Sequence, residues 1–174
     1  MGLTEALDYR FTPPNPLQRT TRRVAASTVG AKEFSRLTRP LDGLVERATG
    51  GRTTASEVLA GLPVVEVTTT GRRSGQPRTA PLVAIPIGDD LALLGTNFGG
   101  PSTPAWVLNL EADPTARLAH RRRTADAVAR PATDDEYELV FADAATRYVG
   151  YERYRERVTH RDIRVFVLTI PPDA

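Results

Sequence analysis

The chain has 174 residues, of which 40% are hydrophobic, and a formal net charge of +2, which predicts one globular domain with its own core. It contains no cysteine, which excludes disulfide bonds and thiolate chemistry. The small charge does not predict the concentrated basic face of a nucleic-acid-binding protein. No apolar run reaches the ~18–20 residues that span a bilayer, and residues 1–11 lack a signal-peptide pattern. We therefore expect a cytoplasmic protein.

The first 60 residues predict an arm followed by a helical segment. Residues 1–15 are expected to be irregular, because prolines near their end disfavour a helix. Asn15-Pro16 is typical of a helix start, and Gly50-Gly51 of a helix end. The basic and apolar residues between them leave weak peripheral membrane association open. We separate residues 1–60 from a domain over 61–174 and expect the two to form one structural unit.

Strands and short helices follow in alternation. Strands are predicted over residues 64–70, 79–87, 91–96, 115–120, 124–130 and 163–170. Gly88-Asp89-Asp90 indicates a hairpin turn, so the strand before it and the strand after it are expected to pair. Helices are predicted over 103–111, with Thr103 as N-cap and Pro104 at the first helical position, and over 133–158, broken near Gly150. This order predicts an α+β fold, a small antiparallel barrel with helices outside.

A glycine-bracketed turn follows the first strand, with the sequence Gly71-Arg72-Arg73-Ser74-Gly75. On composition alone it is compatible with a solvated hairpin loop. Arg78 follows closely, however, and glycine backbone N–H groups beside arginines form a cradle for anions. The turn lacks the residues of a P-loop and the glycine spacing of a dinucleotide-binding fingerprint. Ser74 has no histidine or aspartate partner that would activate it as a nucleophile.

A second glycine-containing segment, Asn97-Phe98-Gly99-Gly100, follows the 91–96 strand. Glycine here lets a planar ligand approach the backbone closely. Trp106 and Asn109 lie one helical turn apart and therefore share a face of the predicted helix. A lone tryptophan is more often a core residue, and that interpretation stays open beside a role in a ligand site.

Three tyrosines, Tyr148, Tyr151 and Tyr154, are spaced three residues apart on the last predicted helix. They form either an aromatic stripe of the core or a wall over a flat ring, with hydroxyl groups turned toward a substrate. His120 and His160 have no partners at the spacing of metal ligands, so no metal site is expected.

Three stretches of the sequence resemble the deazaflavin-dependent nitroreductase family, a branch of the flavin/deazaflavin oxidoreductases that is abundant in actinobacteria. They are TTTGRRSGQPRTAPL, GTNFGGPSTPAWVLNLEADP and YVGYERYRERVTHRDIRVFVL, within about residues 60–170. The resemblance implies a split β-barrel and coenzyme F420, a deazaflavin with a phosphodiester and an oligoglutamate tail. The chain departs from the family at Arg73, where lysine is frequent, and at Ser102-Thr103, where histidine or lysine is frequent.

The resemblance also implies site residues. Those matching the phosphate and glutamate contacts are Arg72, Arg73, Ser74 and Arg78, with Gly75, Thr79 and Pro81 beside them. Those matching the part of the site that lines the deazaflavin ring are Asn97, Phe98, Gly99, Gly100, Trp106 and Asn109. Tyr151 and Tyr154 match the family's tyrosines near the substrate pocket, and with Tyr148 they are the catalytic candidates.

The activity that the resemblance implies is hydride transfer from reduced F420 to a quinone, a nitroaromatic or another conjugated small molecule. The cofactor carries the chemistry, so no metal and no protein nucleophile are required. Two alternatives stay open on the residues alone: a split-barrel reductase that uses FMN, and a carrier of a cofactor or lipid without turnover. Either a monomer or a homodimer is compatible with the sequence.

Overall fold

The computed structural model describes residues 2–12, 18 and 61–172. The predicted helical segment, with its start at Asn15-Pro16 and its end at Gly50-Gly51, falls on residues 13–17 and 19–60 and lies outside these described residues, Gln18 excepted.

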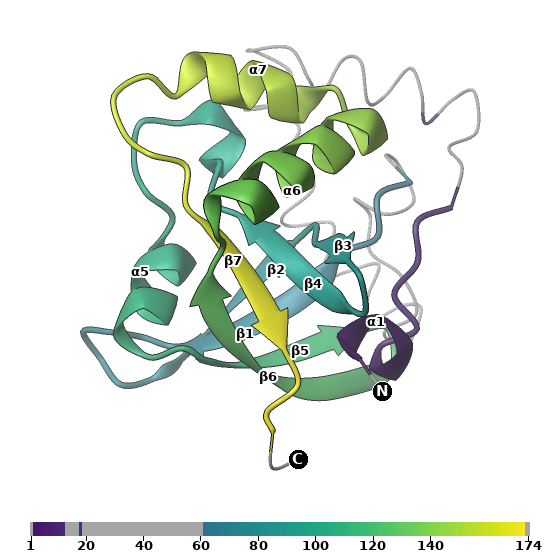
Figure 1. Ribbon diagram of the computed structural model, residues 1–174. Coiled ribbons are helices and arrows are strands. Elements are labelled where there is room, and N and C mark those ends of the chain that lie inside the picture. Colours follow the sequence, from purple (N-terminus) through teal and green to yellow (C-terminus); the bar gives the residue numbers. More distant parts are fainter. Residues whose placement is uncertain (1, 13–17, 19–60, 173–174) are drawn as a thin grey trace.

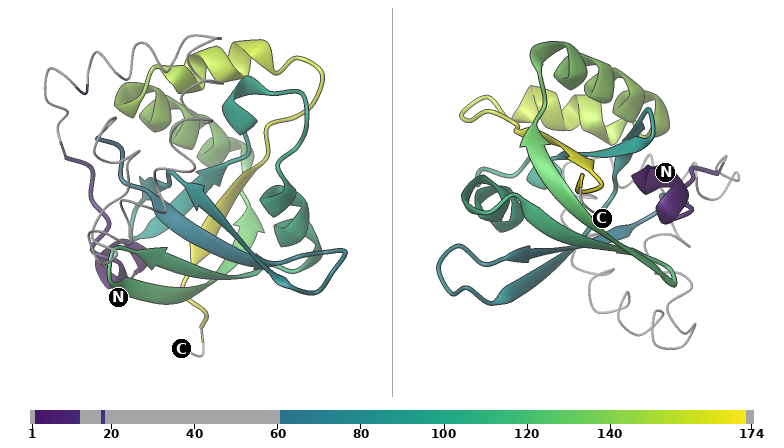
Figure 2. Two further views of the ribbon diagram at one scale, coloured as in Figure 1. Left: turned by 180° about the vertical axis from the view of Figure 1, so that it is seen from behind. Right: turned by 60° about the horizontal axis from the view of Figure 1, so that its bottom comes forward.

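The described strands form one antiparallel sheet in the order β2-β1-β5-β6-β7-β4-β3, which curls into a half-barrel (Figure 1). Their bounds are β1 Val65–Thr70, β2 Pro77–Leu82, β3 Ile85–Ile87, β4 Asp90–Leu94, β5 Thr115–His120, β6 Arg123–Pro131 and β7 Val165–Thr169. The predicted hairpin at Gly88 and Asp89 is confirmed, since Ile87 pairs with Asp90 across it. The tip of the β1–β2 hairpin projects beyond the rest of the sheet (Figure 2).

Helices pack at the ends and on one outer face of this sheet (Figure 1). They are α1 Leu3–Ala6, the 3-10 turn η1 Asn97–Gly99, α5 Ala105–Ala112, α6 Asp134–Arg147 and α7 Gly150–Arg157. A capping box starts α6: the Glu136 N–H donates to the Thr133 hydroxyl, and the Thr133 N–H donates to the Glu136 carboxylate. The predicted break near Gly150 is confirmed, because α6 and α7 are separate helices.

Two apolar clusters lie on opposite sides of the sheet. One fills the half-barrel and includes Leu3, Trp106 and Phe166, and the other lies under α6 and α7 and includes Phe141 and Val165. Strand β7 is therefore buried on both faces from Val165 to Leu168. The sheet is a rigid two-sided platform that fixes the loops at its ends.

The single strand predicted over residues 79–87 is wrong. Strands β2 and β3 lie at opposite edges of the sheet, with Val83 and Ala84 between them. The reason is a distant side chain: the Tyr9 hydroxyl accepts a hydrogen bond from the Ala84 N–H (3.0 Å) and lies 3.0 Å from the Ala84 carbonyl oxygen. The Ala84 N–H is thus paired outside any ladder, the Tyr9 hydroxyl proton is shared between the Pro63 (2.8 Å) and Ala84 carbonyl oxygens, and the chain crosses to the other edge.

Two further predictions near helix starts are wrong. The arm is not irregular throughout, because α1 forms one turn that buries Leu3, and Leu7 directly after it is also buried; the prolines that disfavour a helix lie too far along the chain to affect it. Helix α5 begins at Ala105 with Pro104 as its N-cap residue and without a side-chain cap, so Thr103 does not cap it.

Candidate functional site

Backbone hydrogen bonds close the Gly71–Gly75 turn on itself. The Gly71 N–H donates to the Gln76 carbonyl (2.9 Å), and the Ser74 and Gly75 N–H groups both donate to the Gly71 carbonyl (3.0 and 2.7 Å). Gly75 has φ +64°, the left-handed region that favours glycine. The turn therefore holds its shape without using its arginine side chains.

The guanidinium groups of Arg72, Arg73 and Arg78 are exposed. Within the described part of the chain, none of them forms an ion pair with a carboxylate. Other arginines of the molecule do so: the pairs are Arg130–Glu136, Arg147–Asp143, Arg155–Glu138 and Arg164–Glu111. The turn thus presents three cations whose charge no described side chain neutralises, which suits an anionic ligand.

Asn109 on α5 anchors this turn to the body of the protein. Its side-chain oxygen accepts the Arg72 backbone N–H (3.1 Å), and its amide nitrogen donates to the Thr69 hydroxyl (3.0 Å). Asn109 is only 5% exposed, so both amide atoms are used inside the protein. The structure gives this residue a defined task, positioning of the arginine turn, and its predicted contact with a ligand stays a prediction.

The Asn97–Gly100 loop leaves the end of β4 in a rare backbone conformation. Asn97, Phe98 and Gly99 have φ values of +47°, +55° and +77°, three left-handed residues in succession. The Asn97 amide donates to the backbone and side-chain oxygens of Ser102 (3.0 and 3.2 Å). Phe98 is left 47% exposed, so its ring lies at the surface of the loop and not in the core.

The three tyrosines form one buried cluster at the start of α7. Their ring centroids lie 5.9 to 6.2 Å apart at steep angles, and the hydroxyl groups of Tyr148 and Tyr154 are 3.3 Å apart. Burial is the first cause that raises the pKa of Tyr148, Tyr151 and Tyr154 above the ordinary phenol value. All three phenols therefore stay protonated near neutral pH, and one of the Tyr148 and Tyr154 hydroxyls donates to the other.

The turn, the loop and the tyrosine cluster are connected to one another by contacts and by helix α5. The Phe98 ring contacts Tyr154 edge to face at 6.2 Å, which joins the loop to the tyrosine cluster. Helix α5 joins the loop to the turn, since Asn109 lies five residues beyond Pro104, on the order of 8 Å along the helix. The loop is thus in direct contact with the tyrosines, and helix α5 connects it to the turn.

The remaining predicted site residues, Trp106, Thr79 and Pro81, lie apart from these contacts. Trp106 is buried against Phe166, with ring centroids 6.3 Å apart. Thr79 and Pro81 are exposed on the face of β2 opposite Arg78, and the Thr79 hydroxyl bonds that of Thr68 (2.8 Å). Their predicted cofactor contacts stay predictions.

An open cavity of about 420 Å³ adjoins the turn on the sheet. It is lined by residues of β1, β5 and β6 together with Gly75, Pro77 and Pro171. Of the predicted site residues, Gly75 alone lines it. Among the described residues, no group of three histidine, cysteine or acidic side chains is placed to hold a metal ion.

Known proteins that are similar to this chain show which family it belongs to. The family model described as "F420H(2)-dependent quinone reductase" matches residues 23–170. The chain belongs to the F420H(2)-dependent quinone reductase family. An F420H(2)-dependent quinone reductase of Mycobacterium tuberculosis is 30% identical over 135 residues, which cover 74% of this chain and 87% of that protein.

Solved structures of relatives agree with this family and with the fold. An F420-H2 dependent reductase is 32% identical, with a TM-score of 0.55 over 61% of this chain and 93% of that one. A protein described as a domain-swapped dimer is 27% identical, with a TM-score of 0.58 over 79% and 98% of the two chains. The predicted split β-barrel of the α+β class is confirmed, and so is the prediction of an oxidoreductase whose cofactor is F420.

The sequence analysis missed one residue that belongs to this region, Arg161. It follows α7 in the segment Thr159-His160-Arg161-Asp162 and contacts the Asn97–Gly100 loop from behind. In sequence it is one of many arginines after the tyrosines, and no spacing rule distinguishes it from its exposed neighbours. Only the crossing of residues 160–161 behind the end of β4 sets it apart.

Proposed function

We propose that this reductase passes hydride from F420H2 to a quinone, with the anionic tail of the cofactor on the arginine turn and its ring beside the Asn97–Gly100 loop. The observation that supports the assignment of the tail is a set of three exposed guanidinium groups, none of them in an ion pair with a described carboxylate, on a turn that is fixed by its own backbone. A phosphodiester and several glutamate carboxylates match such a set, and guanidinium groups bind both anions through paired N–H donors.

The loop and the tyrosines suit the flat end of the cofactor. The left-handed backbone exposes Phe98 beside Tyr154, so an aromatic edge and protonated phenols border the same place. When bound, F420 supplies the hydride. The protein's own contribution is to orient the ring, exclude water, and donate a hydrogen bond from a tyrosine such as Tyr151 or Tyr154 to the acceptor oxygen as negative charge develops on it.

The quinone is the acceptor that the family description supports, and nitroaromatic compounds are proposed as opportunistic acceptors of the same chemistry. Of the helices that the structure describes, none combines the length and apolarity needed to cross a bilayer. The predicted weak membrane association rests on residues 1–60, most of which lie outside the described residues, and it stays a prediction.

A comparative titration tests the proposal. Purified protein is titrated with F420 of defined tail lengths and with FMN, and cofactor fluorescence reports binding. We expect F420 to bind more tightly than FMN, with affinity that decreases as the tail is shortened and as salt is raised. Turnover is then measured with F420H2 and a menaquinone-like quinone. Equal or tighter binding of FMN, or affinity independent of the tail, would contradict the proposed site.

A further inference from the structure

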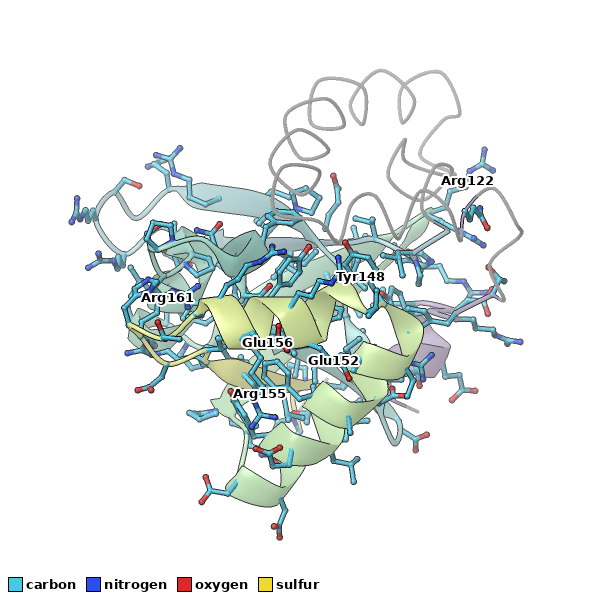
Figure 3. The ribbon with its side chains drawn as sticks, turned by 90° about the horizontal axis from the view of Figure 1, so that it is seen from above. Arg122, Tyr148, Glu152, Arg155, Glu156 and Arg161 are labelled. Atoms are coloured by element: carbon cyan, nitrogen blue, oxygen red, sulfur yellow. The ribbon has the colours of Figure 1, made fainter. Side chains whose placement is uncertain are left out.

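Arg161 donates hydrogen bonds to carbonyl groups at both ends of the Asn97–Gly100 loop. Its Nη1 donates to the carbonyl oxygens of Gly95 (3.0 Å) and Asp162 (3.3 Å), and its Nη2 donates to those of Thr96 (3.0 Å) and Gly100 (3.2 Å). Figure 3 shows Arg161 beyond one end of α7, whereas Tyr148 lies at the other end of that helix. Of these four acceptors, Gly95 and Thr96 precede the left-handed residues and Gly100 follows them, so the guanidinium spans the loop.

Among the described residues, the groups that accept hydrogen bonds from Arg161 are all backbone carbonyls. In the part of the chain that the structure describes, no carboxylate lies within 4.0 Å of it, and its buried Nε has no hydrogen-bond partner. The neighbouring Arg164 differs, since it is exposed and pairs with Glu111. A partly desolvated cation without a counter-charge is costly to keep, so a purely structural arginine would be expected at a paired position.

The loop needs an external restraint because its backbone is strained. Each left-handed non-glycine residue costs energy, and Asn97 and Phe98 adopt that conformation in succession. Such residues persist when the surroundings over-determine them. Arg161 supplies this restraint together with His160, whose Nε2 lies 2.9 Å from the Pro101 carbonyl oxygen. Residues 160–161 thus hold the loop from its inner side, and Phe98 is directed toward Tyr154.

We propose that Arg161 is a positioning residue for the cofactor ring: by bridging the carbonyls of Gly95, Thr96 and Gly100 it fixes the left-handed loop against which the ring lies. This inference rests on the proposed function, in which the loop borders the ring. In this proposal Arg161 acts through the loop backbone that it bonds, and the cofactor ring lies against the loop itself. The planar fork of the guanidinium is essential, because a lysine ammonium is a point donor that cannot hold both ends of the loop.

The experiment compares Arg161→Lys and Arg161→Gln with the matched control Arg164→Gln, which removes a neighbouring arginine outside the loop. Hydrogen exchange of the Gly99 and Gly100 amides is measured first in the protein without cofactor, because these amides donate to Thr96 and Asn97 within the loop. We expect exchange to accelerate about tenfold or more in both Arg161 variants and to be unchanged in the control.

Cofactor readouts then separate positioning from general support of the fold. With Arg161→Lys we expect about a tenfold weaker F420 affinity, a shifted absorption band of bound F420, and a lower kcat at saturating F420H2 and quinone. The control is expected to keep all three values. A merely structural role would lower the melting temperature of the Arg161 variants and leave the band and the kcat of the folded protein unchanged.

Three outcomes would overturn the inference. The loop amides of Arg161→Lys could exchange at the wild-type rate, or they could exchange faster while the absorption band of bound F420 and kcat stay unchanged. The control Arg164→Gln could also show the same losses as the Arg161 variants. The double variant Arg73→Ala/Arg78→Ala tells this failure apart from failure of the proposed function. If that variant loses F420 affinity while Arg161→Lys behaves as wild type, the cofactor site stands and the role of Arg161 is wrong. If the double variant binds F420 normally, the proposed site itself is wrong.

Discussion

The Gly71–Gly75 turn and the Asn97–Gly100 loop both contain glycine and lie at the two ends of α5, yet they use arginine in opposite ways. The turn is held by its own backbone and by Asn109, and its guanidinium groups face solvent. The loop also has backbone hydrogen bonds of its own, but a guanidinium bonds its carbonyl groups in addition, and Phe98 is exposed. The arginine side chains of the turn are left exposed because backbone bonds and Asn109 already fix its shape.

A third use of arginine completes this comparison. On α6 and α7, Arg147 and Arg155 pair with carboxylates and lie over aromatic rings, with Arg147 4.3 Å from the Phe11 centroid. These residues join helices and the N-terminal arm to one another. The same side-chain type is therefore exposed on the turn, where we propose that it binds the cofactor, bonded to a loop backbone at Arg161, and paired with carboxylates on α6 and α7.

The largest effect is expected from removing the free cations of the turn. Each charge-assisted contact contributes roughly 1.5–3 kcal/mol, so Arg73→Ala/Arg78→Ala should raise the Kd for F420 about 100-fold or more. The melting temperature should barely change, because the turn does not depend on these side chains. Fluorescence titration and thermal unfolding check both values, and affinity should also become less sensitive to salt. Normal binding combined with a large loss of stability would show that these arginines are structural.

A smaller effect on turnover is expected from the tyrosines beside the loop. Tyr151→Phe/Tyr154→Phe keeps the aromatic wall and removes two hydroxyl donors, so kcat with a quinone should fall about tenfold, as for lost positioning hydrogen bonds. F420 affinity should stay unchanged. Tyr137→Phe on α6 is the matched control, since its ring packs against Phe141 outside the tyrosine cluster. Full activity of the double variant on every acceptor would reduce the tyrosines to core packing.

Matched glycine substitutions sharpen the difference between the two loops. An alanine at Gly75, which has φ +64° and no neighbouring atom within 4 Å of a built Cβ, should cost about 1 kcal/mol of backbone strain. An alanine at Gly99, which has φ +77°, would also meet Arg157 atoms at 3.1 and 3.4 Å. We expect Gly99→Ala to cost about 2 kcal/mol and to lower kcat. Urea unfolding and steady-state turnover check these values. Equal effects at both positions would show that the close packing of Arg157 against Gly99 adds no cost.

The smallest effect concerns an arginine used for the fold. Pairing with Arg130 and the Thr133 backbone lowers the pKa of Glu136 from 4.5 to about 2, so its stabilising effect is complete above pH 4.5 and is lost as the pH falls toward 2. Because the pair is partly exposed, Glu136→Gln should lower the free energy of unfolding at pH 7 by only about 0.5–1 kcal/mol. The gap to wild type should close between pH 4.5 and pH 2 in urea unfolding, while F420 affinity at neutral pH stays unchanged. If Glu136→Gln changed the affinity for F420, arginines paired within the fold could no longer be distinguished from those proposed to bind the cofactor.

Local patterns of the sequence were enough for much of the fold and for the parts of the site. Alternation predicted β1, β5 and β6 to within a few residues, since these strands have one buried and one exposed face. Thr133 followed by three acidic residues indicated the start of α6, and Gly150 the break before α7. The motifs around Arg72, Asn97 and Tyr151 indicated the family, which the match of the family model over residues 23–170 shows.

The tertiary structure decided what depends on contacts between distant residues. Tyr9 divides the predicted 79–87 strand across 75 residues of sequence, and Arg161 reaches the loop across 61 to 66 residues. The amide of Asn109 is likewise directed to Arg72, 37 residues away. Local propensity cannot predict such contacts. A hydroxyl or guanidinium can bond any backbone carbonyl group, and only the folded chain brings a particular one within hydrogen-bond distance. The sequence therefore determined which residues are candidates for the chemistry, and the tertiary structure determined which arginines stay exposed and which bind the backbone of the chain itself.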